Sequence, residues 1–444
     1  MRRLRQAGMV IGALVILTVA GAAIWLHFAP LALLRVGAGY AAKIVCSNVF
    51  IAGRDPAEIL AVDVQAPGHP LLRLMEVKQE ERRVRASLLG IFASNEAVYR
   101  DGLGCAVAPE GTVADLDAPV SSPPREAASA WPNGEQTESQ PAFTRILSDK
   151  TLTGPGMRAV VVVKDGRIVA EAYGDGFSSE TPLLGWSMAK TVNAVLAGTL
   201  VAKGRLSLSD RGLLPQWKGD ERSEITLAQL LAMEDGLASN ESYGTVTDVT
   251  EMLYLAPDMA AFAADAPLEA SPGTRFNYSS GSAVLISRIW MDRAGTSSQA
   301  LAYPREALFN PLGMESAVME ADASGTFVGS SYMYATARDW ARLALFLLQD
   351  GVWGGERLLP EGFVGAMSQP NATSDGRYSR MQTWLTGREE AGLPGDTFFL
   401  QGHDGQTIAV IPSRKMAVIR LGLTPRADGY EVTRLVREIA RAAE

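Results

Sequence analysis

The chain has 444 residues, of which 47% are hydrophobic and 7% are aromatic, and its formal net charge at pH 7 is −8. This length favours two folded units with additional segments, and the composition argues against a disordered protein. The acidic balance, without a basic stripe, argues against nucleic acid as a partner.

The chain begins with a basic stretch followed by an apolar one. Residues 7–26 carry no formal charge, and three arginines precede them within the first five residues. A stretch of this length spans a bilayer as a helix, and the positive-inside rule places the arginines in the cytoplasm. We therefore expect residues 1–35 to be an uncleaved single-pass anchor in a bacterial inner membrane, with the catalytic domain in the periplasm. Because residues 20–22 resemble a cleavage site, export after signal cleavage is the alternative.

Residues 36–106 are expected to form a small extracytoplasmic segment, and residues 107–141, rich in Pro, Ser and Ala, a linker. The chain has two cysteines, Cys46 and Cys105, and both fall between the anchor and the main domain. In an oxidising compartment such a pair forms one disulfide, whereas two buried free thiols are the alternative. We expect the disulfide.

The main domain, residues 142–444, has strand patterns at both ends. Residues 159–173 predict a β-hairpin around an Asp-Gly turn, and residues 397–421 predict three more strands. The sequence between them is mostly helical. This order predicts an α/β (α+β) fold in which N- and C-terminal strands share one antiparallel sheet, flanked by helices and joined to a helical subdomain.

Ser187-Met188-Ala189-Lys190 carries the strongest chemical signal, and Ser187 is the only serine with a lysine three residues later. On a helix these two residues share one face, so the lysine amine reaches the serine hydroxyl. The free N–H groups and partial positive charge of a helix N-terminus suit an oxyanion and disfavour a protonated lysine. A helix N-cap serine followed by an exposed lysine is the alternative.

Two further loops carry residues of catalytic type. Tyr278 lies in a polar loop just before a predicted helix, and a tyrosine beside a lysine can relay protons. His403 lies in the glycine-flanked stretch Gly402-His403-Asp404-Gly405, and glycines in a strand often mark close approach of a ligand. With three histidines far apart in the sequence, neither a Ser-His-Asp triad nor a histidine metal site is expected, and no cofactor is implied.

The order of these motifs resembles the serine β-lactamase and DD-peptidase superfamily, on its class C side. The matching motifs are Ser-x-x-Lys, Tyr278-Ser279-Ser280 and His403-Asp404-Gly405. Within the superfamily, residues 131–134, 240–243 and 330–336 are most similar to the 6-aminohexanoate-dimer hydrolases. The resemblance extends over about residues 131–444 and implies a β-lactamase/transpeptidase-like fold.

The resemblance also implies roles for individual residues. Ser187 would attack a carbonyl carbon, neutral Lys190 would accept the serine proton, and Tyr278 would pass a proton to the leaving group. The backbone N–H groups of Ser187 and of Gln406, which follows Gly405, would form the oxyanion hole. His403 would line the site, and Tyr243 would contact the substrate amide.

The sequence departs from the family pattern at two positions. Ser280 stands where the second motif often has asparagine, and Asp404 stands where the third motif often has threonine. The negative charge of Asp404 would repel carboxylate-bearing β-lactams. An unperturbed lysine has a pKa of about 10.4, so the mechanism requires Lys190 to have a lowered pKa. A tyrosinate that shares the proton is the other possible ground state.

These observations predict a serine hydrolase that cleaves a small-molecule amide or ester through an acyl-enzyme. A D-amino-acid peptidase, or a weak β-lactamase or penicillin-binding activity, is the alternative within the enzyme class. A non-catalytic module that binds the cell wall or a protein partner is the alternative from another class, because a fold does not determine function.

Overall fold

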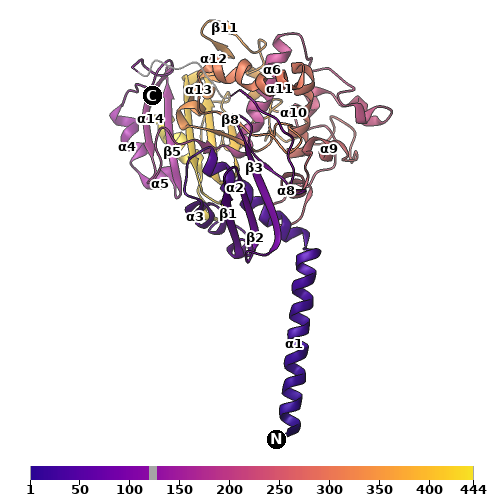
Figure 1. Ribbon diagram of the computed structural model, residues 1–444. Helices are drawn as coiled ribbons and strands as arrows, with labels where there is room; N and C mark the ends of the chain where they lie inside the picture. Colours follow the sequence, from indigo (N-terminus) through magenta and orange to yellow (C-terminus); the bar gives the residue numbers. More distant parts are fainter. Residues whose placement is uncertain (1, 120–127, 444) are drawn as a thin grey trace. The chain divides into compact units, whose positions relative to one another are not determined.

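The computed structural model describes residues 2–119 and 128–443 (Figure 1). The chain forms two compact units. The first consists of Met1–Tyr99, Val107–Thr112 and Ser242–Pro257, and the second of Arg100–Ala106, Val113–Glu241 and Asp258–Glu444. The central Ser-Ser-Pro-Pro stretch of the predicted linker, residues 121–124, lies outside the described residues.

The first unit combines helices with the antiparallel strands β1, β2 and β3. Helix α8, from the middle of the chain, packs on α2 through the rings of Tyr40 and Tyr254, whose centroids are 5.7 Å apart. Asn95 of β3 donates to the Tyr254 carbonyl at 2.9 Å. The elements are α1 (Arg2–Phe28), α2 (Ala32–Phe50), α3 (Pro56–Ile59), η1 (Leu60–Gln65), η2 (Pro70–Leu74), β1 (Met75–Glu80), β2 (Arg83–Leu88), β3 (Phe92–Arg100) and α8 (Asp248–Leu255). Strand β4 (Gly104–Val107) has only Val107 in this unit.

The structure does not support the predicted membrane anchor in the region of helix α1. Across the described part of the chain, no helix has both the length and the apolar character that crossing a bilayer requires. The predicted transmembrane helix within residues 1–35 is therefore wrong, and a membrane partner bound through it is not supported. The location of the catalytic domain is not tested by this finding and stays a prediction.

The second unit is built on a five-stranded antiparallel sheet of order β12-β13-β14-β5-β6. Its strands are β5 (Met157–Lys164), β6 (Arg167–Tyr173), β12 (Phe398–Gly402), β13 (Gln406–Ile411) and β14 (Met416–Gly422). The β5–β6 hairpin turns at Asp165 and Gly166, which both have positive φ, as the Asp-Gly signal predicts. Because β14 pairs with β5, strands from the two ends of this unit share one sheet.

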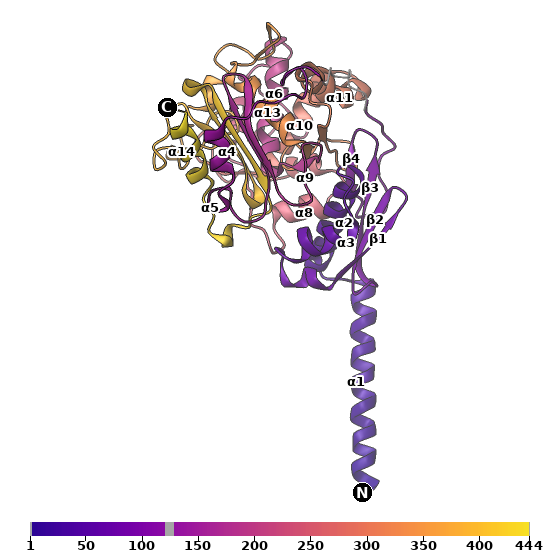
Figure 2. The same ribbon diagram turned by 90° about the vertical axis from the view of Figure 1, so that its left-hand side faces the viewer.

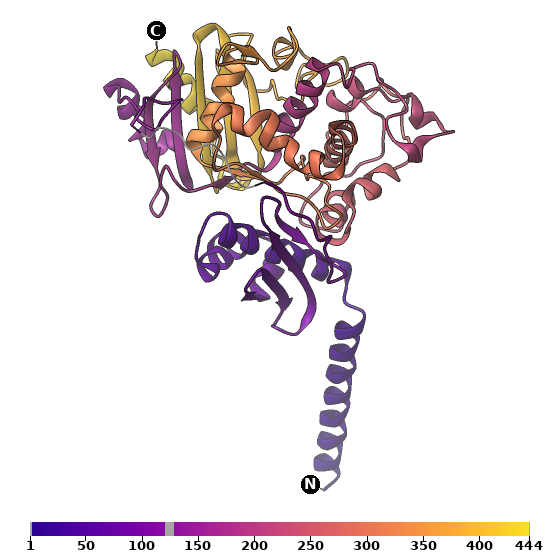
Figure 3. The ribbon, with the colours of Figure 1, turned by 45° about the horizontal axis from the view of Figure 1, so that its top comes forward.

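Helices cover both faces of this sheet (Figures 2 and 3). On one face, α4 (Pro141–Leu147) and α14 (Val432–Ala442) pack on alternate strand residues, among them Val160, Val162 and Val418. The alternation follows from the two-residue period of a strand. On the other face, α13 (Ala337–Leu348) contacts β5, β13 and β14. Beyond it lie α6 (Ala189–Ala202) and α10 (Ser280–Ala294), which contact each other and belong to the helical part of the unit.

The second unit also contains short helices, turns and two small sheets of order β7-β9-β8 and β10-β11. These elements are α5 (Lys150–Thr153), β7 (Leu183–Leu184), η3 (Trp186–Met188), η4 (Pro215–Trp217), η5 (Glu221–Glu224), α7 (Leu227–Leu231), α9 (Met259–Ala264), α11 (Ser297–Pro304), η6 (Arg305–Phe309), α12 (Asn310–Leu312), β8 (Val318–Met319), β9 (Met333–Ala335), β10 (Val352–Trp353), β11 (Glu356–Arg357), η7 (Gly365–Met367), η8 (His403–Gly405), η9 (Pro412–Arg414) and η10 (Arg426–Asp428).

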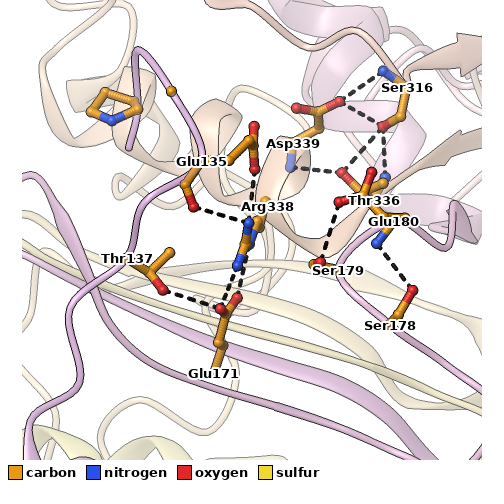
Figure 4. Close-up of polar contacts among 12 residues, drawn as sticks. Glu135, Thr137, Glu171, Ser178, Ser179, Glu180, Ser316, Thr336, Arg338 and Asp339 are labelled. Atoms are coloured by element: carbon orange, nitrogen blue, oxygen red, sulfur yellow. Dashed lines mark hydrogen bonds and ion pairs between the residues drawn. The ribbon is translucent and has the colours of Figure 1, made fainter. Parts of the chain in front are cut away.

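A polar network connects the segment that precedes α4 to the sheet and to α13 (Figure 4). Arg338 of α13 lies between two carboxylates: Nη1 is 2.9 Å from Glu135 and Nη2 is 2.6 Å from Glu171 of β6. Thr137 donates to the same Glu171 carboxylate at 3.2 Å. These contacts attach residues 135–137, which precede α4, to β6 and α13, and these two elements support the site described below.

Cys46 and Cys105 are both fully buried, and neither is a free thiol in the structure. Their pairing with each other stays a prediction.

We expect non-reducing peptide mapping to yield one cross-linked peptide that contains both Cys46 and Cys105 and separates on reduction. Loss of such a bond typically destabilises a protein by about 2–5 kcal/mol, so Cys46→Ser should lower the urea midpoint. Recovery of two separately alkylated cysteines from native protein would contradict the pairing.

Candidate active site

Ser187 lies in a tight turn between β7 and α6, in the 3-10 segment η3. Gly185 begins this turn, and a Cβ at that position would lie 2.4 Å from the Trp340 ring of α13. Only glycine allows the turn to approach the helix this closely. The serine is therefore presented at the start of α6, where backbone N–H groups are free of intrahelical partners.

Trp186, just before Ser187, has φ of 48°, a left-handed conformation that costs a non-glycine residue about 1–3 kcal/mol. Its ring packs against those of Tyr332 and His403, with centroid distances of 6.1 Å and 5.6 Å. These contacts offset the backbone strain, so the turn is held in one conformation beside the serine.

Lys190 is the buried centre of the site, with 1% of its surface exposed. Its Nζ lies 3.2 Å from Ser187 Oγ, 3.0 Å from Ser280 Oγ and 2.9 Å from the Ser330 carbonyl oxygen. The structure thus brings together the serine and the lysine that the sequence singles out. Ser280, at the position where the family often has asparagine, supplies the hydroxyl that contacts the amine.

Burial lowers the pKa of Lys190 to about 8, against the opposing effect of the Glu241 charge, which raises it. With that pKa, about a tenth of the lysine is neutral at pH 7, compared with about one in a few thousand for an unperturbed lysine. The site therefore contains an amine that can act as a base near neutral pH.

Glu241 is a site residue that the sequence reasoning missed. Its carboxylate accepts a hydrogen bond from the Ser280 backbone N–H at 2.9 Å and another from the Ser280 hydroxyl. A chain of contacts therefore runs from Glu241 through Ser280 and Lys190 to Ser187. The signal available in the sequence was an acidic residue inside the stretch 240–243 that resembles the 6-aminohexanoate-dimer hydrolases.

Tyr278 joins the same cluster. The Lys190 Nζ lies 4.7 Å from the centre of its ring, and its hydroxyl interacts with the side chains of Ser187 and Trp384. Burial, with the Glu241 charge, raises the pKa of Tyr278 above its usual range. Because the tyrosine pKa is raised and the lysine pKa is lowered, a neutral tyrosine beside a neutral lysine is favoured over a tyrosinate beside an ammonium. Trp384 was not anticipated from the sequence.

The third motif forms a tight turn beside the nucleophile. Asp404 and Gly405 both have positive φ, 57° and 82°, in the three-residue connection 403–405 between β12 and β13. A Cβ on Gly402 would lie 2.2 Å from the Gly185 carbonyl oxygen and 3.1 Å from the Trp186 Cβ. Glycine at 402 therefore lets the turn pack directly on the segment that precedes Ser187.

The remaining predicted residues differ in position. His403 is half-exposed, packs edge-on against Trp186, and has its Nε2 3.3 Å from the Asp404 carboxylate. The Gln406 side chain is buried and accepts from the Gly422 N–H at 2.9 Å, and the role of its backbone N–H in an oxyanion hole stays a prediction. Tyr243 belongs to the first unit, whereas the others belong to the second, and its contact with substrate stays a prediction.

The family model described as beta-lactamase matches residues 150–440. The chain belongs to the beta-lactamase family. The 6-aminohexanoate-dimer hydrolase of Paenarthrobacter ureafaciens is 24% identical over 307 residues, which is 61% of this chain and 73% of that protein.

Solved structures agree with this family membership. A Bacillus anthracis protein provisionally named a 6-aminohexanoate-dimer hydrolase is 22% identical, with a TM-score of 0.59 and coverage of 72% of this chain and 89% of that one. A family VIII carboxylesterase is 17% identical, with a TM-score of 0.55 and coverage of 69% and 99%. At these identities the likeness shows the fold alone. The predicted superfamily and its α/β fold are confirmed, apart from the membrane helix corrected above.

Glu241→Gln tests the electrostatics of the site. Since the Glu241 charge raises the Lys190 pKa, its removal should lower that pKa below about 8. If neutral Lys190 is the base, the rising limb of the kcat/KM profile should move to lower pH, measured with a p-nitrophenyl ester.

Glu234→Gln is a matched control, because Glu234 accepts from Thr373 at 2.7 Å and, unlike Glu241, is not a charge that shifts the Lys190 pKa, so the profile should stay unchanged. If the midpoint of the rising limb of the kcat/KM profile stays in place or moves to higher pH in Glu241→Gln, neutral Lys190 is not the base.

Proposed function

We propose that this protein is a serine hydrolase that cleaves an amide or ester bond through a covalent acyl-enzyme. One observation carries the proposal: a buried Lys190 amine with a lowered pKa lies 3.2 Å from the Ser187 hydroxyl. A nucleophile and a base within hydrogen-bond reach are the minimal requirement for this chemistry.

In the acylation step, Ser187 Oγ forms a bond to the substrate carbonyl carbon as its proton passes to Lys190. The oxyanion that develops is stabilised by the backbone N–H groups of Ser187 and Gln406. The bond to the leaving nitrogen or oxygen then breaks, and Tyr278 supplies the proton that the leaving group needs and regains one from Lys190. In deacylation, water attacks the ester carbon and loses its proton to the same pair, and Ser187 is released as the hydroxyl.

Amides and esters are proposed as the substrate class because relatives of both kinds share the family. The 6-aminohexanoate-dimer hydrolase is an amide-cleaving relative by name, and the carboxylesterase shares the fold. Asp404 and half-exposed His403 occupy the motif at which this family often has lysine or histidine followed by threonine. The negative charge of Asp404 disfavours a substrate that presents a carboxylate there, which argues against strong β-lactamase activity.

Ser187→Ala should abolish ester hydrolysis and fluorophosphonate labelling with no change in the circular dichroism spectrum. Lys190→Ala should lower kcat by about 10³-fold or more, because nucleophile and base act as a unit. Ser297→Ala, at the exposed start of α11, is the matched serine control and should retain full activity. Labelling that persists at another serine in Ser187→Ala would reject the assignment.

A substrate panel separates the remaining alternatives. It would include p-nitrophenyl esters, short linear amides, D-amino-acid peptides and a chromogenic cephalosporin. Turnover of the peptides or the cephalosporin in preference to linear amides and esters would favour the peptidase or β-lactamase alternative. The absence both of turnover and of an acyl-enzyme by mass spectrometry would favour a non-catalytic binding module.

A further inference from the structure

Arg420 of β14 is fully buried, its hydrogen-bond acceptors are uncharged oxygens, and its guanidinium lies 4.8 Å from the centre of the Tyr430 ring. Its Nη1 donates to the Gly405 carbonyl at 3.2 Å, and its Nη2 donates to the Pro155 carbonyl at 3.0 Å and to Thr424 Oγ1 at 2.6 Å. Its Nε donates to the Thr153 carbonyl at 3.2 Å. Burying a cation on neutral acceptors is costly, since a salt bridge or water would stabilise the charge better.

The Gly405 carbonyl belongs to the peptide group whose N–H is that of Gln406. A trans peptide is planar, so its C=O and N–H point in opposite directions. A donor that holds the Gly405 oxygen therefore sets the direction of the Gln406 N–H on the other side. A charged donor also polarises that peptide, and hydrogen bonds in a chain strengthen one another in a low-dielectric interior.

Other contacts fix the same turn. The Thr424 N–H donates to the Asp404 carbonyl at 2.9 Å, and the Gln406 side chain donates to the His403 carbonyl at 3.1 Å. The packing around the guanidinium is tight: a Cβ on Gly405 would lie 2.9 Å from Arg420 Nη1, and a Cβ on Gly422 would lie 2.6 Å from it. The turn is thus held against Arg420 on one side and against the Ser187 segment, through Gly402, on the other.

We propose that Arg420 is a positioning residue for the oxyanion hole: through the Gly405 carbonyl it orients and polarises the Gln406 N–H toward the developing oxyanion. This inference rests on the proposed function, because it assigns Gln406 the oxyanion role described there. Arg420 itself does not touch substrate.

The test compares Arg420→Gln and Arg420→Lys with the wild-type protein, using a p-nitrophenyl ester and a fluorophosphonate. Removing one oxyanion donor costs about 10²–10³ in kcat, so misorienting it in Arg420→Gln should lower kcat by about tenfold or more. KM should change by less than about threefold, because the contact acts in the transition state. Arg420→Lys, which retains the charge, should recover part of the loss.

The endpoint and the rate of labelling separate positioning from folding. The endpoint of fluorophosphonate labelling gives the fraction of protein molecules whose active site can react, whereas the rate of labelling reports the stabilisation of the oxyanion. We expect Arg420→Gln to keep a full endpoint with a slower rate. The control is Arg342→Gln, because Arg342 of α13 is also fully buried and donates to the Pro132 and Gly134 carbonyls, in addition to the Asp339 and Glu135 carboxylates. It should lower the urea midpoint and leave kcat per labelled site unchanged.

An Arg420→Gln protein with unchanged kcat per labelled site would overturn the proposal, as would an endpoint that falls in proportion to activity. If Arg420→Gln does not fold, Thr424→Val removes one acceptor of the guanidinium and keeps the arginine. It should lower kcat per labelled site by a smaller factor, and an unchanged kcat in that folded variant would overturn the proposal. Absence of turnover and labelling in the wild-type protein would instead reject the proposed function itself.

Discussion

The exclusion of water from the Lys190 amine is the constraint on which the site depends. A buried amine must find acceptors within the protein, and here they come from the start of α10 and from the loop before β9. The same contacts that satisfy the amine therefore fix three parts of the second unit around Ser187. Glu241 opposes the desolvation, so the pKa of the base is a balance between burial and one nearby charge.

Close backbone approach is the second requirement, and glycines meet it. Gly185 lets the nucleophile turn lie on α13, and Gly402 lets the β12–β13 turn lie on the nucleophile turn. Behind that turn, Gly405 and Gly422 leave room for the Arg420 guanidinium. Rigid layers thus meet at Ser187 without side chains between them, which is how a site gains preorganised donors.

Local patterns in the sequence predicted the parts of the fold that depend on local chemistry. The Asp165-Gly166 turn and the one-turn spacing of Ser187 and Lys190 follow from backbone preferences and helix geometry. Glu241 and Arg420 could not be found this way, because each acts on residues distant in sequence and neither carries a recognisable motif. The predicted transmembrane helix rested on the length and lack of charge of one stretch, whereas no helix among the described residues meets the requirements of a bilayer span.

The way the chain divides between its units has a consequence for biosynthesis. Helix α8, encoded after much of the second unit, has buried residues such as Val249 and Leu253 and belongs to the first unit. On the ribosome, the N-terminal helices and strands therefore emerge long before the piece that completes them. A nascent chain halted before Ser242 leaves that unit unfinished, so the protein is not assembled one unit after the other, as separate domains commonly are.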